Sequence, residues 1–357
     1  MRKEVTTLTM EGYEVVVVGA GLVGEEMIKV LKQRKFPVKS ITVLARSARK
    51  QVIDGDEYDV LPTTPDAFEG KDIAFFAGTE GEKGASHTFG WEAVERGCFV
   101  IDNGDDFRMD DRVPLVVPEA NADAIEGHQG FVSNPNCSTI QMVAALAPLN
   151  RKSPIRRIVV STYQSVSGSG GGAVRELETQ THEYAHGGVK TVEQYTYQIL
   201  GNLIPQISGL KDEYPGYYGE EIKMIKETQK IFDLPDLKVS ATCVRVPVRR
   251  SHSETINVEF DSPITVEEAR ELLAAEPGII VIDDPANAKY PMPLDAEGKD
   301  ETFVGRIRQD PGNPNALDLW VVADNIRKGA ATNAVQIAEI AVERGWLIKK
   351  CVAPAGA

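Results

Sequence analysis

The first third of the chain alternates between short apolar runs and segments with apolar residues at helical spacing. Glu14–Val18 is a valine-rich run that predicts a strand buried on both faces. Glu25–Gln33 places its apolar residues three and four positions apart, which predicts a helix. Further apolar runs predict strands at Ile41–Leu44, Asp72–Ala77, Phe99–Asp102 and Phe131–Ser133. The alternation predicts a doubly wound parallel sheet in an α/β domain.

The pattern changes after about residue 150, where longer strands with fewer intervening helices are predicted. These strands are Arg157–Val166, Lys238–Val248, Glu254–Phe260, Phe303–Arg308 and Leu317–Ala323. They indicate a mixed or antiparallel α+β sheet, with one apolar face available for a partner. A last helix, from about Lys328 to Gly345, has an apolar face that we expect to pack against the first sheet. We therefore expect one domain from residues 1–136 and 328–357, and a second from residues 137–327.

The composition is that of a globular protein with an acidic surface. Among 357 residues, 39 are Lys or Arg and 53 are Asp or Glu, which gives a net charge of −14. Such a surface repels phosphate backbones and anionic lipids, so we expect neither nucleic acid nor a membrane as a partner. The N-terminus does not read as a secretory signal, and no apolar run is long enough to span a membrane. Wide spacing of the four cysteines, Cys98, Cys137, Cys243 and Cys351, favours reduced thiols and a cytoplasmic location.

The first predicted strand and helix are joined by a glycine-rich loop. Gly19, Gly21 and Gly24 form a GxGxxG pattern between them, which is typical of a Rossmann-type dinucleotide site. The residues between these glycines, Leu22 and Val23, stand where the helix N-terminus would offer N–H groups to a pyrophosphate. The next strand is followed by a cationic segment that starts at Arg46 and Ser47 and has no acidic residue. A ribose 2′-phosphate fits this segment better than a bare hydroxyl, so we expect NADP.

One cysteine lies where a nucleophile is expected. Cys137 follows a predicted strand and begins a helix that runs to about Leu149, with Asn136 and Ser138 as capping residues. The helix dipole at that position favours a thiolate, so we expect the pKa of Cys137 to be lowered. A thiolate beside a nicotinamide indicates attack on an aldehyde, followed by hydride transfer that leaves a thioester. The other three cysteines are interpreted as structural.

Several segments resemble the bacterial type of aspartate-β-semialdehyde dehydrogenase. They are Ser133–Gln141, Ser161–Gly172, Arg175–Thr181, Arg245–His252 and Asp324–Glu339. The resemblance implies a glyceraldehyde-3-phosphate-dehydrogenase-like fold with a catalytic and dimerisation domain. It implies NADPH-dependent reduction of L-4-aspartyl phosphate to L-aspartate 4-semialdehyde and phosphate, or the reverse reaction, in the biosynthesis of lysine, diaminopimelate, threonine, methionine and isoleucine. It also implies a homodimer, with pairing of dimers into tetramers left open.

The same resemblance implies a role for each of nine residues. The catalytic set is the nucleophile Cys137, the acid–base His252, the orienting Gln164, and Asn136. We expect His252 to exchange protons near neutrality, close to its unperturbed pKa. The substrate-binding set is Arg245 for the carboxylate, Glu220 for the ammonium, and Lys223 with Arg108 for the phosphate. Asn325 is expected at the cofactor. Two carboxylates near the phosphate site, Asp105 and Asp106, would weaken anion binding unless they turn outward.

Two alternative functions stay open on the residues alone. N-acetyl-γ-glutamyl-phosphate reductase uses the same thiol, NADP and acyl-phosphate chemistry, although an acetylated amine would not need Glu220. A zinc peptidase is a more distant alternative, because His182, Glu183 and His186 form an HExxH pattern. No downstream segment clearly supplies the third zinc ligand, so we expect no metal.

Overall fold

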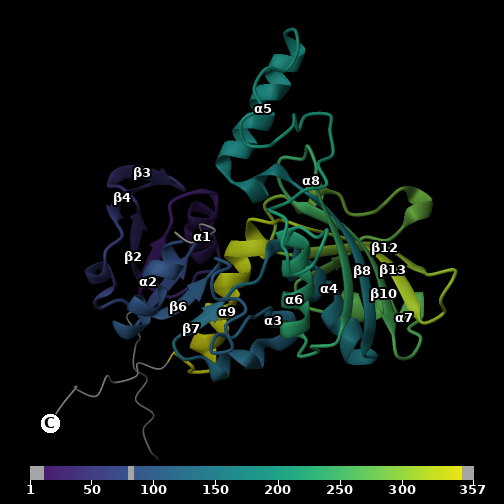
Figure 1. The fold of residues 1–357 in the computed structure, drawn as a ribbon. Coiled ribbons are helices and arrows are strands. Elements are labelled where there is room, and N and C mark those ends of the chain that lie inside the picture. The colour runs from purple at the N-terminus through teal and green to yellow at the C-terminus, as the bar shows by residue number, and fades with distance from the viewer. Residues whose placement is uncertain (1–11, 79–83, 348–357) are drawn as a thin grey trace, which may run out of the picture.

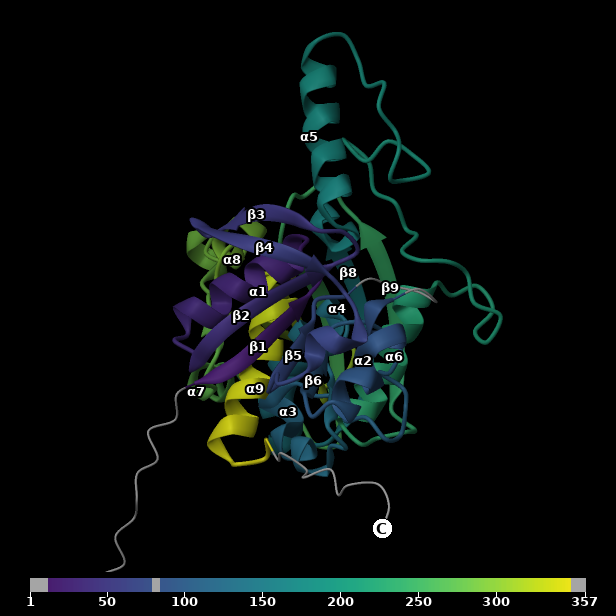
Figure 2. The same cartoon turned by 90° about the vertical axis from the view of Figure 1, so that its left-hand side faces the viewer.

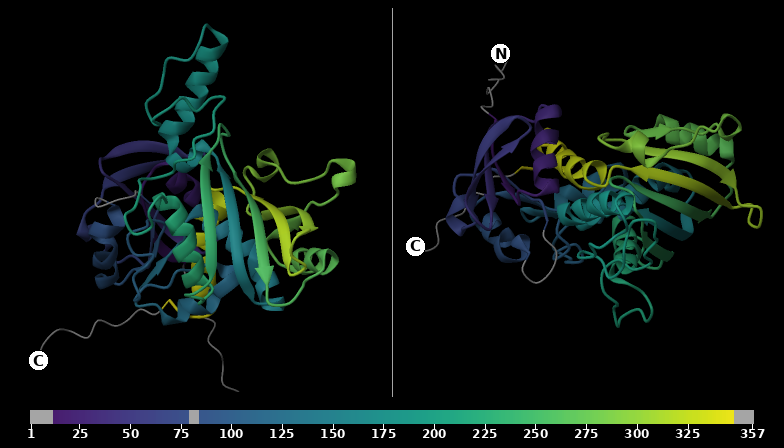
Figure 3. Two further views of the ribbon diagram at one scale, coloured as in Figure 1. Left: turned by 45° about the vertical axis from the view of Figure 1, so that its right-hand side comes forward. Right: turned by 90° about the horizontal axis from the view of Figure 1, so that it is seen from above.

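The computed structural model describes residues 12–78 and 84–347, which form two β-sheets with helices between and around them (Figure 1). Cys351 and the ends of the predicted first domain lie outside the described residues. Seen from above, the two sheets lie on opposite sides of α9 (Thr332–Glu343) (Figure 3). Among the described residues, no helix combines the length and apolar character needed to cross a membrane.

The first sheet has seven strands in the order β3-β4-β2-β1-β5-β6-β7. All neighbours pair in parallel except β3 and β4, which form an antiparallel hairpin. The strands are β1 (Tyr13–Val18), β2 (Val38–Ala45), β3 (Arg49–Ile53), β4 (Asp56–Pro62), β5 (Ile73–Phe76), β6 (Phe99–Asp102) and β7 (Phe131–Ser133). The predicted parallel sheet is confirmed. The polar hairpin was not predicted, because its strands carry few apolar residues.

Helices cover both faces of the first sheet, which explains why its central strands are continuously apolar. Val15 and Val17 pack towards α1 (Leu22–Gln33) and α9, whereas Val16 and Val18 pack towards α2 (Ala85–Glu95). Four short helical segments complete this half: η1 (Pro65–Phe68), α3 (Pro118–Asn121), η2 (Ala122–Gly127) and, before α9, a π-helical turn, η5 (Arg327–Ala331). The last helix thus packs in the first core, as its apolar face predicts.

The second sheet has six strands in the order β11-β12-β13-β10-β8-β9. They are β8 (Ile155–Gln164), β9 (Lys238–Arg245), β10 (His252–Phe260), β11 (Ile279–Val281), β12 (Thr302–Gln309) and β13 (Ala316–Ala323). The pairs β8–β9 and β11–β12 are parallel and the others antiparallel, so the predicted mixed sheet is confirmed.

Only one face of the second sheet is covered by helices of the same chain. That face packs against α4 (Cys137–Lys152), α6 (Gly219–Ile231) and α7 (Val266–Ala275). The opposite face is part-exposed and carries the neighbouring rings of Tyr163 and Trp320, whose centroids lie 5.6 Å apart.

Residues 171–218 extend away from both sheets. After η3 (Val166–Ser169), α5 (Gly171–Ala185) projects from the body of the molecule, and the chain returns in a long connection to α6 (Figure 2). The remaining short segments, η4 (Pro285–Asn287) and α8 (Pro293–Ala296), lie between β11 and β12.

Candidate active site

The glycine loop between β1 and α1 leaves its surface open for a ligand. Gly19 has φ +106°, a backbone region that favours glycine, and a Cβ at Gly24 would lie 1.7 Å from the Gly19 carbonyl oxygen. A Cβ at Gly21 would meet no atom within 4 Å, and Gly21 precedes α1 without a side-chain cap. The first-turn N–H groups at Leu22 and Val23 are therefore uncapped by any side chain. This cradle fits the pyrophosphate of a dinucleotide.

The end of β2 presents cationic and hydroxyl groups beside that loop. Arg46 and Ser47 follow the last residue of β2 and are both exposed. Arg49 and Gln51, on β3, donate to the Ala20 carbonyl oxygen at 3.4 and 3.1 Å, so β3 holds the glycine loop in place. The hairpin that the hydrophobic pattern did not predict therefore forms part of the cofactor-side surface.

Cys137 is the first residue of α4, as its flanking residues predict. The Asn136 side-chain oxygen accepts hydrogen bonds from the N–H groups of Ser138 and Thr139, at 3.0 and 3.3 Å. Burial raises the pKa of Cys137 to about 12, and the negative charge of Glu220 acts in the same direction. The expected lowering of this pKa is therefore wrong for the free protein, because burial outweighs the helix N-terminus and two nearby arginines.

Three predicted site residues meet in one hydrogen-bonded group next to Cys137. The buried carboxylate of Glu220 accepts from the side-chain amides of Asn136 at 2.8 Å and Gln164 at 3.2 Å. Gln164 also donates to the Ser138 hydroxyl at 2.7 Å, which ties the end of β8 to the first turn of α4. The contacts place α4, α6 and β8 around a single point.

Lys223 lies one turn after Glu220 on α6 and joins a second carboxylate. Its ammonium is 3.8 Å from Glu220 and 3.0 Å from Asp105. Nearby positive charges, first among them that of Lys223, outweigh burial and lower the pKa of Asp105. Asp105 therefore faces the predicted phosphate site, contrary to the outward orientation that anion binding seemed to require. Asp106 instead accepts a hydrogen bond from Ser86.

Arg108 is buried and held by three acceptors. It donates to the carbonyl oxygens of Asn134 and Asn103, at 3.0 and 2.8 Å, and to Glu227 at 2.9 Å. Glu227 also accepts from the main-chain N–H of Asn136 at 2.7 Å. Sequence reasoning missed Glu227, although it lies seven residues after Glu220 and therefore on the same face of α6. Its carboxylate couples Arg108 to the residue before the nucleophile.

His252 and Arg245 face the same space beside η3. A Cβ at Gly168 would lie 2.8 Å from an Arg245 nitrogen and 3.2 Å from Nε2 of His252. Only a glycine at this position leaves that space open. Burial and the charge of Arg245 lower the pKa of His252 well below its usual value. The expected titration of His252 near neutrality is therefore wrong for this structure.

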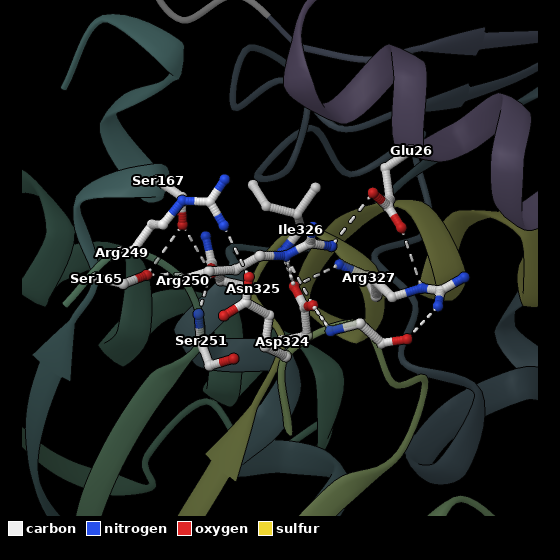
Figure 4. A network of polar contacts seen from close by, with 12 residues as sticks. Glu26, Ser165, Ser167, Arg249, Arg250, Ser251, Asp324, Asn325, Ile326 and Arg327 are labelled. Atoms are coloured by element: carbon white, nitrogen blue, oxygen red, sulfur yellow. Dashed lines mark hydrogen bonds and ion pairs between the residues drawn. The ribbon is translucent and has the colours of Figure 1, made fainter. Parts of the chain in front are cut away.

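Asn325 lies at the centre of a network that leads to His252 (Figure 4). Its side-chain oxygen accepts from the hydroxyls of Ser165 at 3.1 Å and Ser167 at 3.0 Å, and from the Ser251 N–H at 3.0 Å. Only its amide group remains for a cofactor. The sequence analysis missed the three serines, because a serine in a loop carries no periodic signal.

The HExxH pattern serves the projecting arm. Glu183 accepts from the main-chain N–H groups of Lys190 and Thr191 and from the Thr191 hydroxyl, so it anchors the connection after α5. His186 contacts the His182 carbonyl oxygen through Nδ1 at 2.7 Å. Within residues 12–78 and 84–347, no three His, Cys, Asp or Glu side chains gather in a way that could hold a metal ion.

Sequence models of two domain families match this chain. Residues 14–128 match "Semialdehyde dehydrogenase, NAD binding domain", and residues 146–328 match "Semialdehyde dehydrogenase, dimerisation domain". The two matches fall on the first and second sheets respectively.

Similar whole proteins carry one name. The aspartate-semialdehyde dehydrogenase of Bacillus subtilis is 47% identical over 340 residues, covering 92% of this chain and 97% of that protein. That of Aquifex aeolicus is 48% identical over 346 residues, covering 94% and 100%. A crystal structure of aspartate semialdehyde dehydrogenase II from Vibrio cholerae, described as complexed with ASA, matches with a TM-score of 0.88 at 42% identity, covering 93% of this chain and 98% of that one. This chain therefore belongs to the aspartate-semialdehyde dehydrogenase family.

Proposed function

We propose that this protein reduces L-4-aspartyl phosphate to L-aspartate 4-semialdehyde and phosphate, reversibly, through a thioester on Cys137. The observation that carries the proposal is the placement of Cys137 at the start of α4, within one group of fixed charges from α6, β9 and the loop after β6. A nucleophile surrounded by both carboxylate and guanidinium groups matches a substrate that carries an ammonium, a carboxylate and a phosphate.

In the proposed reaction the Cys137 sulfur bonds to the acyl carbon, and the carbon–oxygen bond to phosphate breaks. Bound NADPH supplies a hydride to the resulting thioester. The hemithioacetal on Cys137 then collapses to the aldehyde and returns the sulfur. The amide of Gln164 is tied to Ser138 and Glu220, so it is oriented before substrate arrives.

Substrate recognition is proposed to divide the charges between opposite ends of the molecule. Arg245 would bind the carboxylate as a planar donor, and Glu220 would bind the ammonium. Arg108 and Lys223 would bind the phosphate. Arg108 keeps N–H groups beyond those held by its three acceptors, whereas Lys223 must share its charge with Asp105.

We infer that the cofactor is NADP, bound at Gly19, Gly21 and Gly24 with Leu22 and Val23. Arg46 and Ser47 would contact the 2′-phosphate, because they stand after β2 where an NAD-specific site carries an acidic residue. Asn325 would contact the nicotinamide through its amide group. A titration of NADPH and NADH, followed by protein fluorescence, should give tighter NADPH binding that weakens in Arg46→Ala.

We also propose the division into residues 1–136 with 328–357 and residues 137–327, and a homodimer formed through the uncovered face of the second sheet. The part-exposed pair Tyr163 and Trp320 on that face supports the choice. Pairing of dimers into tetramers stays open. The cytoplasmic location stays a prediction.

The function is tested by phosphate-dependent reduction of NADP⁺ with aspartate semialdehyde. We expect turnover that requires both phosphate and aldehyde, and a loss of at least about 10³-fold in Cys137→Ala with NADPH binding unchanged. Turnover that persists in Cys137→Ala would refute the thioester. N-acetylglutamate semialdehyde as the preferred substrate would instead favour the acetylated alternative.

A further inference from the structure

The main chain determines which nitrogen of His252 carries a proton. The N–H of Ser165 donates to Nδ1 of His252 at 3.0 Å. A main-chain N–H can only donate, so Nδ1 must present its lone pair. The neutral ring therefore carries its single proton on Nε2. In the described part of the chain Nε2 is buried and has no hydrogen-bond partner.

A doubly protonated ring is disfavoured at this position for two reasons. A proton on Nδ1 would meet the Ser165 N–H, and a positive ring would face the guanidinium of Arg245 from β9. The charged groups that follow β13 do not offset this, because Asp324 is paired with Arg250 at 2.8 Å. Burial and Arg245 accordingly lower the pKa of His252.

Contacts on both sides hold Ser165 in this orientation. Its carbonyl oxygen accepts from Arg245 at 2.7 Å, and its hydroxyl donates to Asn325 at 3.1 Å. Asn325 also accepts from the N–H of Ser251, the residue before His252, whose φ of +72° is uncommon outside glycine. The same side chain thus fixes the donor loop and the strand that carries the ring (Figure 4).

We propose that His252 acts as a neutral Nε2–H donor to the substrate oxygen that becomes negative, and that Ser165 and Asn325 are the positioning residues that set this tautomer. The proposal rests on the proposed function and replaces the proton-exchanging role expected for His252. Preorganised N–H donors of this kind stabilise oxyanions strongly, and a neutral histidine can serve as one.

The reaction balances without a proton moving to or from the substrate oxygen. The Cys137 thiolate bonds to the acyl carbon, and phosphate leaves with the electron pair of the broken carbon–oxygen bond. Hydride addition places a pair on the oxygen as an alkoxide. That pair re-forms the carbonyl while the carbon–sulfur bond breaks, which returns the thiolate. The one proton consumed overall is taken from water by the released phosphate.

The tautomer is tested directly by NMR of the full-length protein labelled with ¹⁵N-histidine. The five histidines give few signals, and His252→Gln identifies that of His252. We expect a protonated Nε2 and an unprotonated Nδ1 from about pH 5.5 to about pH 8.5, while ordinary histidines titrate near about 6.5. A proton on Nδ1, or ring protonation within this range, would overturn the proposal. Because no substrate is needed, this result is independent of whether the proposed function holds.

Two positioning variants separate orientation from general stability. Asn325→Ala should shift part of the His252 population towards protonated Nδ1, because the Ser165 loop and Ser251 lose their common acceptor. Ser167→Ala is the matched control, since it removes one donor to Asn325 but no contact to the ring, and should leave the His252 spectrum unchanged. An unchanged spectrum in folded Asn325→Ala would remove Asn325 from this role.

The donor role itself is tested by single-turnover hydride transfer. His252→Gln places an amide N–H near the position of Nε2 but cannot exchange protons, and it should retain activity within about 10-fold of the parent. His252→Ala should lose about 10²- to 10³-fold, as when an oxyanion donor is removed. A glutamine variant that binds NADPH yet is as slow as the alanine variant would overturn the donor role.

Discussion

At the scale of single residues, the environment of Cys137 sets opposing effects on one thiol. Glu220 and burial raise its pKa, while Arg245 and Arg108 lower it. The net pKa of about 12 leaves the free protein with little thiolate at neutral pH. Reactivity in the free protein is therefore governed by the nearest carboxylate as much as by the helix N-terminus.

Replacing Glu220 by Gln should have opposite effects on thiol reactivity and on turnover. The amide removes the negative charge but keeps an oxygen that can accept from Asn136 and Gln164. We expect iodoacetamide to modify Cys137 several-fold faster at pH 8, because more thiolate is present, while KM for the aldehyde rises. Cys137→Ala identifies the alkylated site. Slower alkylation in the Gln variant would contradict the proposed electrostatic effect.

Glu254 is a buried carboxyl on β10, two residues after His252. Its side chain faces the covered side of the sheet, and burial raises its pKa well above the usual range, with Gln141 offsetting part of the effect. The folded protein therefore holds this group protonated, whereas the unfolded chain ionises it above about pH 4.3. Folding then takes up a proton, so the contribution of Glu254 to stability falls as pH rises above that value.

Glu254→Gln should therefore be stabilising in a pH-dependent way. The variant keeps the shape of the neutral acid and cannot ionise. Its advantage in free energy of unfolding should be absent near pH 4 and grow by about 1.4 kcal/mol per pH unit until the folded group ionises. Urea unfolding at several pH values measures it. Glu271→Gln, on an exposed site of α7, is the control and should show no such trend.

At the scale of elements, the turn from β1 into α1 uses its glycines for different purposes. Gly24 allows the helix to approach the Gly19 carbonyl, while Gly21 leaves open space at the surface. One glycine thus serves packing, and the other serves the ligand. Both lie within four residues, so the two functions can be separated by single substitutions.

Gly24→Ala and Gly21→Ala form a matched pair. In Gly24→Ala the new methyl group would overlap the Gly19 carbonyl, and we expect a loss of about 3 kcal/mol in stability. In Gly21→Ala the methyl group meets no protein atom, so stability should change by less than about 1 kcal/mol. NADPH affinity should nevertheless fall at least about 10-fold, because the methyl group occupies the approach of the pyrophosphate. Equal NADPH binding in Gly21→Ala and the parent would argue against a dinucleotide in this cradle.

At the scale of the whole molecule, an ionic network joins the first-sheet helix α1 to segments of the second sheet. Glu26, buried on α1, lies 3.3 Å from both Arg250 and Arg327 (Figure 4). Arg250 precedes β10 and also pairs with Asp324 after β13. The network thus connects the cofactor side of the molecule to the strand that carries His252.

Glu26→Ala should destabilise the protein far more than removal of an exposed charge pair. The substitution leaves two largely buried arginines with fewer partners, which costs about 3 kcal/mol. Glu57→Ala, which breaks the exposed pair of Lys50 and Glu57, should cost less than about 1 kcal/mol. Urea unfolding of both variants compares them. Equal losses would show that the buried network does not contribute more than a surface pair.

Local patterns in the sequence determined most of the architecture. Runs of valine and helical periodicity predicted the parallel sheet, the mixed sheet and the final helix, because burial of each face is encoded within a few residues. The start of α4 at Cys137 was also predicted, since capping depends on Asn136 next to it. The β3–β4 hairpin escaped prediction, because its strands are largely polar and gain their place from pairing with β2.

Only the tertiary structure decided how the site is charged and protonated. The pKa of Cys137 depends on Glu220, and the protonation of His252 depends on Arg245 and the Ser165 N–H, groups that lie far from each other along the chain. Burial and electrostatic interactions act over distances in space, so no local pattern in the sequence contains them. The sequence determined which groups are present, and folding decided which of them hold a charge.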